Sequence, residues 1–316
     1  MIEILRTSQD GTLEELSINE AKNGSWFNLI NPTEDEIQKV SLVLDLDEAF
    51  LRNCLDIEER SRVEIEDGHL LVITSVPIME DESTFDTIPM GMIFTPTSFI
   101  TVCSRSNKVI QSFNKDTAKF FDTNAKTRFM LSILFRISKF YLRYLTYINK
   151  HTDKIEANLH KSMKNKEIFQ LLEIQKSLVY FTTALKDDNV VLQRIMRLTK
   201  GADVAGLSFS EDDIDLLEDV IIENRQAIEM VEMHRNILEN MMDAFAAVVS
   251  NNLGDVMRFL TSLTILFAIP TMIGSFWGMN TAVPHEGNIL GFYYVVAAAL
   301  VCAVIAAIYL KKRKML

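Results

Sequence analysis

Charged residues are missing from two long stretches near the C-terminus of this 316-residue chain. No Asp, Glu, Lys or Arg occurs from Phe259 to Pro284, or again from Gly287 to Leu310. Each stretch is longer than the roughly 20 apolar residues that cross a ~30 Å hydrocarbon layer as a helix. The alternative is a buried hairpin in a soluble protein, but core helices rarely run so long without a charge. The lack of charge therefore predicts two membrane spans.

Other absences narrow the class of protein. The chain has three cysteines, Cys54, Cys103 and Cys302, which share no metal-ligand spacing and form no disulfide framework, as suits a reducing cytosol. The N-terminus has no apolar run, so no signal peptide is expected. Residues 1–120 contain no Gly-rich phosphate loop, no Ser/His/Asp set and no paired metal ligands. The sequence therefore gives no basis for catalysis, and we expect a protein that is not an enzyme.

The distribution of charge indicates partners and orientation. The net charge of −11 argues against nucleic acid and suits a cation, although charge alone favours the simpler interpretation of ordinary acidic solubility. Arg258 precedes the first apolar stretch and the basic run 311–314 follows the second, whereas residues 281–288 carry no Lys or Arg. Positive residues stay on the cytoplasmic side of a membrane. Both termini are therefore predicted to be cytoplasmic.

Residues 1–125 carry the signals of a mixed α/β domain. The segment Trp26–Ile30 is typical of a strand that precedes a turn. Thr33 and Glu36 have the spacing of a capping box, which predicts that a helix begins there. Further strands are expected at Leu70–Val76, which Pro77 would end, and in a hairpin of Met92–Phe94 with Ser98–Val102.

The remaining soluble part is predicted to be helical. Residues 126–199 contain neither Pro nor Gly, which favours two antiparallel helices that turn near Lys161–Lys166, before a small-residue break at Gly201–Ser210. From Asp212 to Asn280 one continuous helix would be on the order of 100 Å long. A 3.5-residue repeat along it is apolar at eight of ten positions, which indicates packing against other helices and oligomerisation. Its members are Leu217, Ile221, Asn224, Ile228, Val231, Arg235, Leu238, Met242, Phe245 and Val249.

Small and hydroxyl residues form a second stripe inside the first apolar stretch. They recur at spacings of 3, 4, 3 and 4, which places them on one helix face: Thr261, Thr264, Ala268, Thr271 and Ser275. Lipid would not favour such a face. Close packing of membrane helices, which uses small residues, is one interpretation, and pore lining is the other. The stripe leads directly to Asn280, and this supports pore lining.

The triplet Gly278-Met279-Asn280 closes the first apolar stretch, and with its context it resembles the signature of the CorA family of divalent-cation channels. The context is a C-terminal hairpin of two membrane spans, a short acidic outer loop, a basic tail and a long helix that continues into the first span. Ser250-Asn251-Asn252 also looks like the membrane-entry segment of that family. The segments Trp26–Thr33 and Leu178–Phe181 are similar to stretches that recur in it, so the resemblance covers nearly the whole chain.

The resemblance implies a fold and an assembly. It implies an α+β cytoplasmic domain, a long helical stalk and two C-terminal transmembrane helices, assembled as a funnel-shaped homopentamer in the inner (plasma) membrane. The corresponding division of the chain is a cytoplasmic α/β domain at 1–125, a helical hairpin at 126–210, the stalk at 211–258, the pore-lining span at 259–280, an outer loop at 281–288, the second span at 289–310 and a basic tail at 311–316.

The resemblance also implies roles for residues along the pore. Asn280 would present its side-chain carbonyl in a five-fold ring at the outer mouth, supported by Gly278 and Met279. Such a ring suits Mg²⁺, a hard ion that gives up its water reluctantly. Met257 and Leu260 match positions where the family narrows its pore with apolar side chains, a constriction that can gate by dewetting. Helical geometry alone favours Thr261 over Leu260 on the polar face.

An acidic cluster at residues 211–219 has two interpretations. Acidic residues are favoured near a helix N-terminus, so the cluster can be a solvated helix start. The resemblance instead matches Asp219 to an acidic residue that binds regulatory Mg²⁺ between neighbouring subunits, with Asp215 or Glu218 as candidate partners. Mg²⁺ would then be both the transported ion and the regulator, and filled sites would hold the pore closed.

Two other functions remain open. A ZntB-like Zn²⁺ transporter would share the architecture, although Gly-Met-Asn and a loop with His285 as its one soft ligand favour Mg²⁺. Co²⁺ and Ni²⁺ share octahedral hydration and could also pass. The second alternative is a membrane-anchored sensor that signals without transport; the sequence contains no kinase, cyclase or effector motif in its support.

Overall fold

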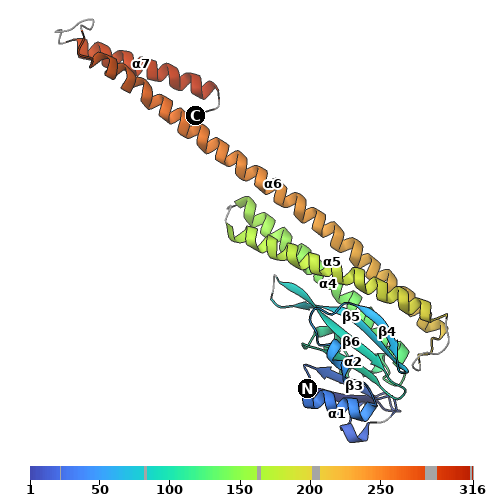
Figure 1. The fold of residues 1–316 in the computed structure, drawn as a ribbon. Coiled ribbons are helices and arrows are strands. Elements are labelled where there is room, and N and C mark those ends of the chain that lie inside the picture. The colour runs from blue at the N-terminus through green and yellow to red at the C-terminus, as the bar shows by residue number, and fades with distance from the viewer. Residues whose placement is uncertain are drawn as a thin grey trace. The chain divides into compact units, whose positions relative to one another are not determined.

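The chain divides into two compact units, Met1–Leu238 and Glu239–Leu316, and each is considered by itself. Helix α6 (Glu211–Trp277) begins in the first unit and ends in the second (Figure 1). The predicted long helix is thus confirmed, but it stops at Trp277 and not at Asn280. The computed structural model describes residues 1–21, 23–81, 84–161, 165–200, 207–281, 290–313 and 315.

The first unit is built on a mixed seven-stranded sheet of order β2-β1-β3-β7-β6-β5-β4. β3 and β7 are parallel, and the other neighbouring strands are antiparallel. The predicted mixed α/β domain is confirmed. The strands are β1 (Ile2–Thr7), β2 (Leu13–Glu15), β3 (Trp26–Ile30), β4 (Arg62–Glu66), β5 (His69–Met79), β6 (Phe85–Phe94) and β7 (Phe99–Cys103).

The first unit also contains short helices and three long ones. They are η1 (Ile18–Glu20), α1 (Glu34–Leu44), α2 (Glu48–Asn53), α3 (Lys108–Gln111), η2 (Lys115–Phe120), α4 (Lys126–Lys161), α5 (Asn165–Leu198) and the first part of α6. α4 and α5 are the predicted helix pair. Of the segments predicted between elements, residues 162–164, 201–206 and 282–289, with His285, lie outside the described residues, as does Lys314 in the basic tail.

Local sequence signals determine several of these boundaries. β3 has the predicted limits, and β6–β7 is the predicted hairpin. The capping box at α1 is also confirmed, because the Thr33 hydroxyl accepts from the backbone N–H of Glu36 at 3.3 Å and the Glu36 carboxylate accepts from Thr33 N–H at 2.8 Å. This second hydrogen bond lowers the pKa of Glu36.

The prediction that Pro77 ends a strand is wrong. β5 continues through Pro77, which pairs with Thr87 of β6. The neighbouring strand β4 pairs with β5 only as far as Ile73. Pro77 therefore lies on an edge segment of β5, where a residue without an N–H is tolerated.

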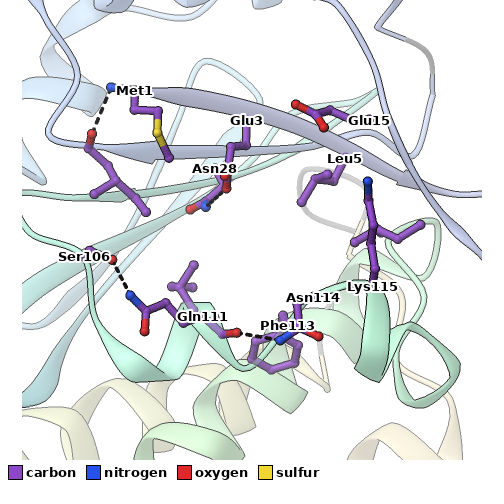
Figure 2. A pocket seen from close by; sticks show the side chains of 13 residues that line it. Met1, Glu3, Leu5, Glu15, Asn28, Ser106, Gln111, Phe113, Asn114 and Lys115 are labelled. Carbon is purple, nitrogen blue, oxygen red and sulfur yellow. Dashed lines mark hydrogen bonds between the residues drawn. The ribbon is translucent and has the colours of Figure 1, made fainter.

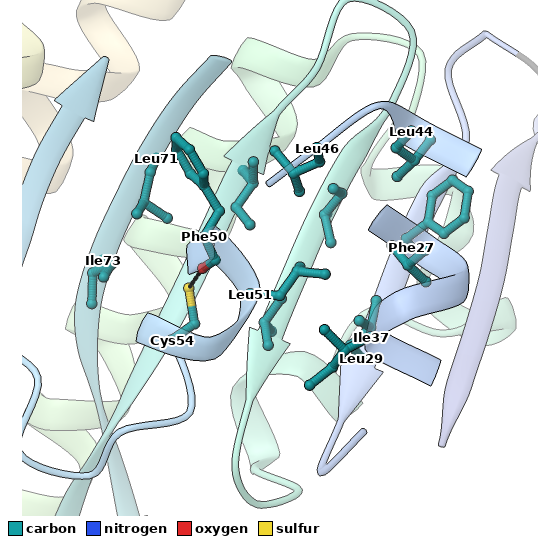
Figure 3. Close-up of a cluster of buried hydrophobic side chains, with 14 of the residues drawn as sticks. Phe27, Leu29, Ile37, Leu44, Leu46, Phe50, Leu51, Cys54, Leu71 and Ile73 are labelled. Carbon is teal, nitrogen blue, oxygen red and sulfur yellow. Dashed lines mark hydrogen bonds between the residues drawn. The ribbon is translucent and has the colours of Figure 1, made fainter. Parts of the chain in front are cut away.

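One face of the sheet packs against α1 and α2. Alternate strand residues such as Phe27 and Leu29 point to this side, where they meet Ile37 of α1 and Leu51 of α2 (Figure 3). All four side chains are at most 1 % exposed. Cys54, at the end of α2, belongs to the same core and its thiol donates to the carbonyl of Phe50. Burial raises the pKa of Cys54 to about 12, so this cysteine is a packing residue and not a nucleophile.

The opposite face of the sheet packs against α4 and α5. Phe129 of α4 lies with its ring centroid 4.9 Å from that of Trp26 and 5.4 Å from that of Phe99. Further along, Tyr141 of α4 meets Phe181 of α5 edge to face at 5.0 Å. The helix pair is therefore an integral layer of the first unit.

Side chains from both helices also cap the part of β5 that extends beyond β4. The Asp188 carboxylate of α5 accepts from Ser75 N–H at 2.9 Å and from the Ser61 hydroxyl at 2.8 Å, while the Tyr141 hydroxyl donates to Ser75 C=O at 3.0 Å. Asp188 is 4 % exposed. Burial raises its pKa to about 7, against the lowering effect of these two donors.

Replacing Asp188 by Asn should make unfolding less dependent on pH. The folded pKa lies above the ordinary value of 3.8, so Asp188 favours the folded state at low pH, and this contribution is lost as pH rises toward 7. A shift of about three units corresponds to at most on the order of 4 kcal/mol. Asn keeps the acceptor oxygen and resembles the protonated acid. Thermal unfolding of the full chain in detergent at pH 5 and pH 8 should show Asp188→Asn stabilised relative to wild type more strongly at pH 8 than at pH 5.

The matched control for this experiment is Asp187→Asn, which removes the same charge from the neighbouring, half-buried position. The charge of Asp187 is the smallest of the causes that act on the Asp188 pKa, so this variant should keep most of the wild-type pH dependence of unfolding. Equal pH slopes for wild type and Asp188→Asn would refute the role assigned to the buried carboxyl.

Candidate functional site

In the second unit, helices cover residues 259–277 and 291–310 of the two uncharged stretches. Among the described residues, α6 and α7 (Gly291–Lys312) are the helices that are long and apolar enough to cross a bilayer. Only 6 % and 11 % of their most apolar windows are buried within the chain. The core helices of a soluble protein would be mostly buried, so the soluble-hairpin alternative does not describe these two helices.

α7 has one face of small residues and one of large residues. The wholly or partly buried positions follow helical spacing and are mostly Gly and Ala: Gly291, Val295, Ala299, Ala303, Ala306, Ala307 and Leu310. Phe292, Leu300 and Ile308 are more than half exposed. Small residues let membrane helices approach closely. α7 lies beside the last part of α6 (Figure 1), and we assign its small-residue face to this contact.

A distinct face of α6 is covered within the second unit. Ser262 is fully buried, and its hydroxyl donates to the backbone carbonyl of Met315 at 2.8 Å. At helical spacing from it follow half-buried residues: Leu266, Ile269, Ile273 and Trp277. These positions form the side of α6 that packs within its own chain.

The Thr/Ser stripe lies on another side of α6. All five of its residues are exposed, and four of them line one shallow groove beside Phe267, Met272 and Phe276: Thr264, Ala268, Thr271 and Ser275. Residues such as Thr271 and Ile273 are two positions apart, which is about 200° around a helix. The stripe therefore does not pack against α7, and a packing role would require another protomer.

The threonine hydroxyls of the stripe have a common orientation. Each donates to the carbonyl four residues earlier: Thr261 to Met257 at 2.8 Å, Thr264 to Leu260 at 2.9 Å and Thr271 to Phe267 at 2.8 Å. This bond is common for Thr in membrane helices. Because the hydrogen of each hydroxyl is used in the helix, the oxygen offers only lone pairs to whatever lies beside the stripe.

The Gly278-Met279-Asn280 triplet follows the last residue of α6. Gly278 N–H still bonds to Gly274 C=O at 3.0 Å, and Met279 N–H reaches Phe276 C=O at 3.5 Å. Gly278 is not among the glycines with positive φ, which in the described residues are Gly11, Gly24 and Gly68. Met279 is 52 % exposed and Asn280 is also exposed. The triplet thus places an unburied amide at the end of the stripe.

The two residues expected to narrow the pore lie at the N-terminal end of the stripe along α6. Met257 and Leu260 are each 53 % exposed, and Thr261 is exposed as well. Large apolar side chains that are half exposed in the single chain are typical of a surface that contacts lipid or another protomer.

The acidic cluster at the start of α6 separates into two kinds of residue. Asp213 is buried, accepts from the Ser210 hydroxyl at 2.7 Å and lies 3.4 Å from the guanidinium of Arg128. Asp215, Glu218 and Asp219 are exposed. Asp213 is therefore a helix-capping residue, which the Ser-x-x-Asp spacing could have revealed. Among described residues, no group of three His, Cys, Asp or Glu is placed to hold a metal ion.

The long helix α6 extends from the α/β unit to the first membrane span, where one of its faces carries hydroxyls, and α7 is the second membrane span. This architecture is typical of a membrane transport protein. The family described as CorA-like Mg²⁺ transporter protein matches residues 21–312, and the chain belongs to this family. The resemblance noted in the sequence is thereby confirmed.

Individual relatives agree with this assignment. The chain is 25 % identical to the cobalt/magnesium transport protein CorA of Methanocaldococcus jannaschii, over 96 % of each chain. The complete structure of the CorA magnesium transporter from the same organism superposes with a TM-score of 0.83 at 24 % identity, covering 98 % of this chain and 96 % of the other. The ZntB cytoplasmic domain from Vibrio parahaemolyticus matches with a TM-score of 0.61 at 10 % identity, covering 79 % of this chain and 98 % of the domain. That ZntB domain thus shares the fold of 79 % of this chain.

Proposed function

We propose that this protein is a Mg²⁺ channel that takes up divalent cations, with Co²⁺ and Ni²⁺ as further candidate ions. Family membership gives the class of function. The proposed mechanism rests on the exposed Thr/Ser stripe of α6. This stripe lies on a face that α7 does not cover, and it leads to Asn280. Relatives named cobalt/magnesium transport protein support the choice of ions.

The stripe suits a hydrated cation. The water molecules around Mg²⁺ point their hydrogens outward, and Mg²⁺ releases these waters slowly. Hydroxyl oxygens whose hydrogens are bonded within the helix, as at Thr264 and Thr271, accept hydrogen bonds from such waters. The side-chain carbonyl of Asn280 would do the same at the outer mouth, where neutral oxygens can hold the hydrated ion without removing its shell.

The proposed pore needs several copies of α6, because one helix cannot enclose an ion. We propose a homopentamer in which the α6 helices surround the axis, residues 259–280 line the pore, and α7 lies outside with its large apolar side chains toward lipid. Met257 and Leu260 would form the inner constriction. Residues 1–125, 126–210 and 211–258 would be cytoplasmic, as would the basic tail, in line with the positive residues at 258 and 311–314.

We further propose that cytosolic Mg²⁺ closes the channel by binding Asp219 together with carboxylates of a neighbouring protomer. Asp215 and Glu218 lie four residues and one residue before Asp219 on α6. Both are exposed, and they are candidate partners. Bound Mg²⁺ would screen repulsion between protomers, and its loss would favour the open state. The ligand thereby biases a two-state equilibrium.

Asp219→Ala should weaken inhibition of transport by internal Mg²⁺. Loss of one carboxylate that contributes roughly 1 kcal/mol to binding raises the half-inhibitory concentration about fivefold. The measurement is Mg²⁺ uptake into proteoliposomes loaded with graded internal Mg²⁺. Asp212→Ala, an exposed acidic residue in the first turn of α6, is the matched control. Wild-type inhibition in a combined Asp215, Glu218 and Asp219 alanine variant would exclude the cluster from regulation.

Uptake of Mg²⁺ into proteoliposomes also tests the function itself. With little Mg²⁺ inside, we expect uptake that follows the Mg²⁺ gradient and does not require a pH gradient. Uptake of Zn²⁺ in preference to Mg²⁺, driven by protons, would instead support the ZntB-like alternative. The absence of any divalent-cation flux under these conditions would contradict the proposal and favour the membrane-anchored sensor.

A further inference from the structure

A cavity of about 350 Å³ lies at the edge of the sheet in the first unit, between β1–β3 and the α3–η2 segment (Figure 2). The geometry of the strands determines which side chains line its walls. Side chains alternate between the two faces of a strand, so Ile4, Phe27 and Leu29 enter the core. Their neighbours Glu3, Leu5 and Asn28 face the cavity. Residues paired across strands share a face, and the pairs Leu5–Glu15 and Glu3–Asn28 bring these side chains to one wall.

The floor of the cavity is apolar and its rim is charged. Leu13, Ile110 and Phe113 line it and are at most 7 % exposed. Glu3 and Glu15 extend from the strands, and Lys115 extends from the opposite wall (Figure 2). A ligand in this cavity would therefore meet an apolar surface, two carboxylates and the Lys115 ammonium group, while the N-terminal ammonium of Met1, also in the lining, is bonded to Ile30 C=O and to Glu36.

A chain of buried hydrogen bonds holds one of these carboxylates in place. The Trp26 indole N–H donates to the Thr101 hydroxyl at 2.9 Å, this hydroxyl donates to the Asn28 carbonyl at 3.1 Å, and the Asn28 amide donates to Glu3 Oε2 at 2.9 Å. Asn28 and Thr101 are 3 % and 0 % exposed. The chain fixes the half-buried Glu3 carboxylate at the cavity wall through one oxygen, and fixed acceptors of this kind provide the specificity of small-molecule sites.

We propose that this cavity binds a free α-amino acid with an apolar side chain. The ammonium group would bind Glu3 and Glu15, the carboxylate would bind Lys115, and the side chain would contact Leu13, Ile110 and Phe113. The volume is at the small end of the ~300–1,000 Å³ range of ligand sites, as a single amino acid requires. A bare metal ion is a poorer fit, since Glu3 and Glu15 are the two carboxylates in the lining.

The proposal is independent of ion transport, and calorimetric titration of the full chain in detergent tests it. The probes are L-leucine, leucinamide, which lacks the carboxylate, and 4-methylpentanoate, which lacks the ammonium group. Leucine should bind, 4-methylpentanoate should not, and leucinamide should bind at least threefold more weakly than leucine. Glu3→Gln, which keeps an acceptor for Asn28, should weaken leucine binding at least tenfold. Lys115→Met should weaken leucine binding and leave leucinamide binding unchanged.

The matched control is Glu14→Gln, which removes the same charge from the alternate position of β2, outside the cavity lining. It should bind leucine as wild type does. The proposal is overturned if neither leucine nor phenylalanine binds at millimolar concentration, if Glu3→Gln and Glu14→Gln behave alike, or if 10 mM Mg²⁺ displaces leucine while Glu3→Gln abolishes Mg²⁺ binding at this cavity.

Discussion

Replacing Asn280 by alanine should abolish Mg²⁺ uptake while the protein still folds and assembles. Asn280 is exposed just beyond the end of α6, so the substitution removes no buried contact of the single chain. In the proposed pentamer it removes five side-chain carbonyls from the outer mouth together. A net hydrogen bond contributes about 1 kcal/mol, and the loss of several at one site corresponds to a fall in ion capture of more than about 100-fold. Uptake into proteoliposomes measures this loss.

Two further variants make the experiment on Asn280 specific. Asn236→Ala changes an exposed asparagine of α6 in the first unit and should leave uptake unchanged. Asn280→Gln keeps the carbonyl one methylene farther out and should retain part of the uptake. Full uptake by Asn280→Ala would show that the ion does not depend on this amide, and would remove Asn280 from the proposed path.

Gly91→Ala should be among the most destabilising single substitutions in the first unit. A Cβ at this position would lie 2.0 Å from Cys54 Sγ and 2.8 Å from Cys54 Cβ. Gly91 pairs with Ile73 on one side and Val102 on the other, so the strand cannot shift away without disturbing both ladders. Overpacking in a core of this kind costs about 1–3 kcal/mol or more. The thermal unfolding midpoint of the full chain is the measurement.

A double variant identifies the cause of this loss. Cys54→Ala alone removes a buried sulfur and should lower stability modestly. Combined with Gly91→Ala, it removes the closest clashing atom, so the pair should be more stable than the sum of the two single effects predicts. Strict additivity would mean that contact with Cys54 does not explain the cost at Gly91.

The predictions that succeeded rest on interactions within a few residues. The capping box of Thr33 and Glu36, the limits of β3 and the β6–β7 hairpin depend on neighbours along the chain. The prediction at Pro77 failed because its tolerance depends on where β4 stops, which is a property of the sheet. The parallel pairing of β3 with β7 likewise joins segments some 70 residues apart and has no local signal.

The candidate site shows the same division between local and long-range information. The spacing of Thr261 to Ser275 predicts one helix face from the sequence alone. Which neighbour that face meets could not be read from the spacing. The structure shows that the face is exposed in the single chain, whereas another side of α6, with Ser262, is covered within the second unit. Asp188 had no sequence signal, because its partners Ser61 and Ser75 are more than 100 residues away.

The hydroxyl stripe has a consequence for the dependence of transport on acidity. Between Phe259 and Pro284 the sequence contains no residue whose side chain gains or loses a proton near neutrality, and the stripe attracts cations through fixed oxygen lone pairs and not through ionised groups. The wall of the proposed pore therefore has the same electrostatic character in acid and in alkali. A change of flux between pH 6 and pH 8 would have to originate elsewhere, and buried Asp188 in the first unit, with a pKa of about 7, is a group that changes charge across that interval.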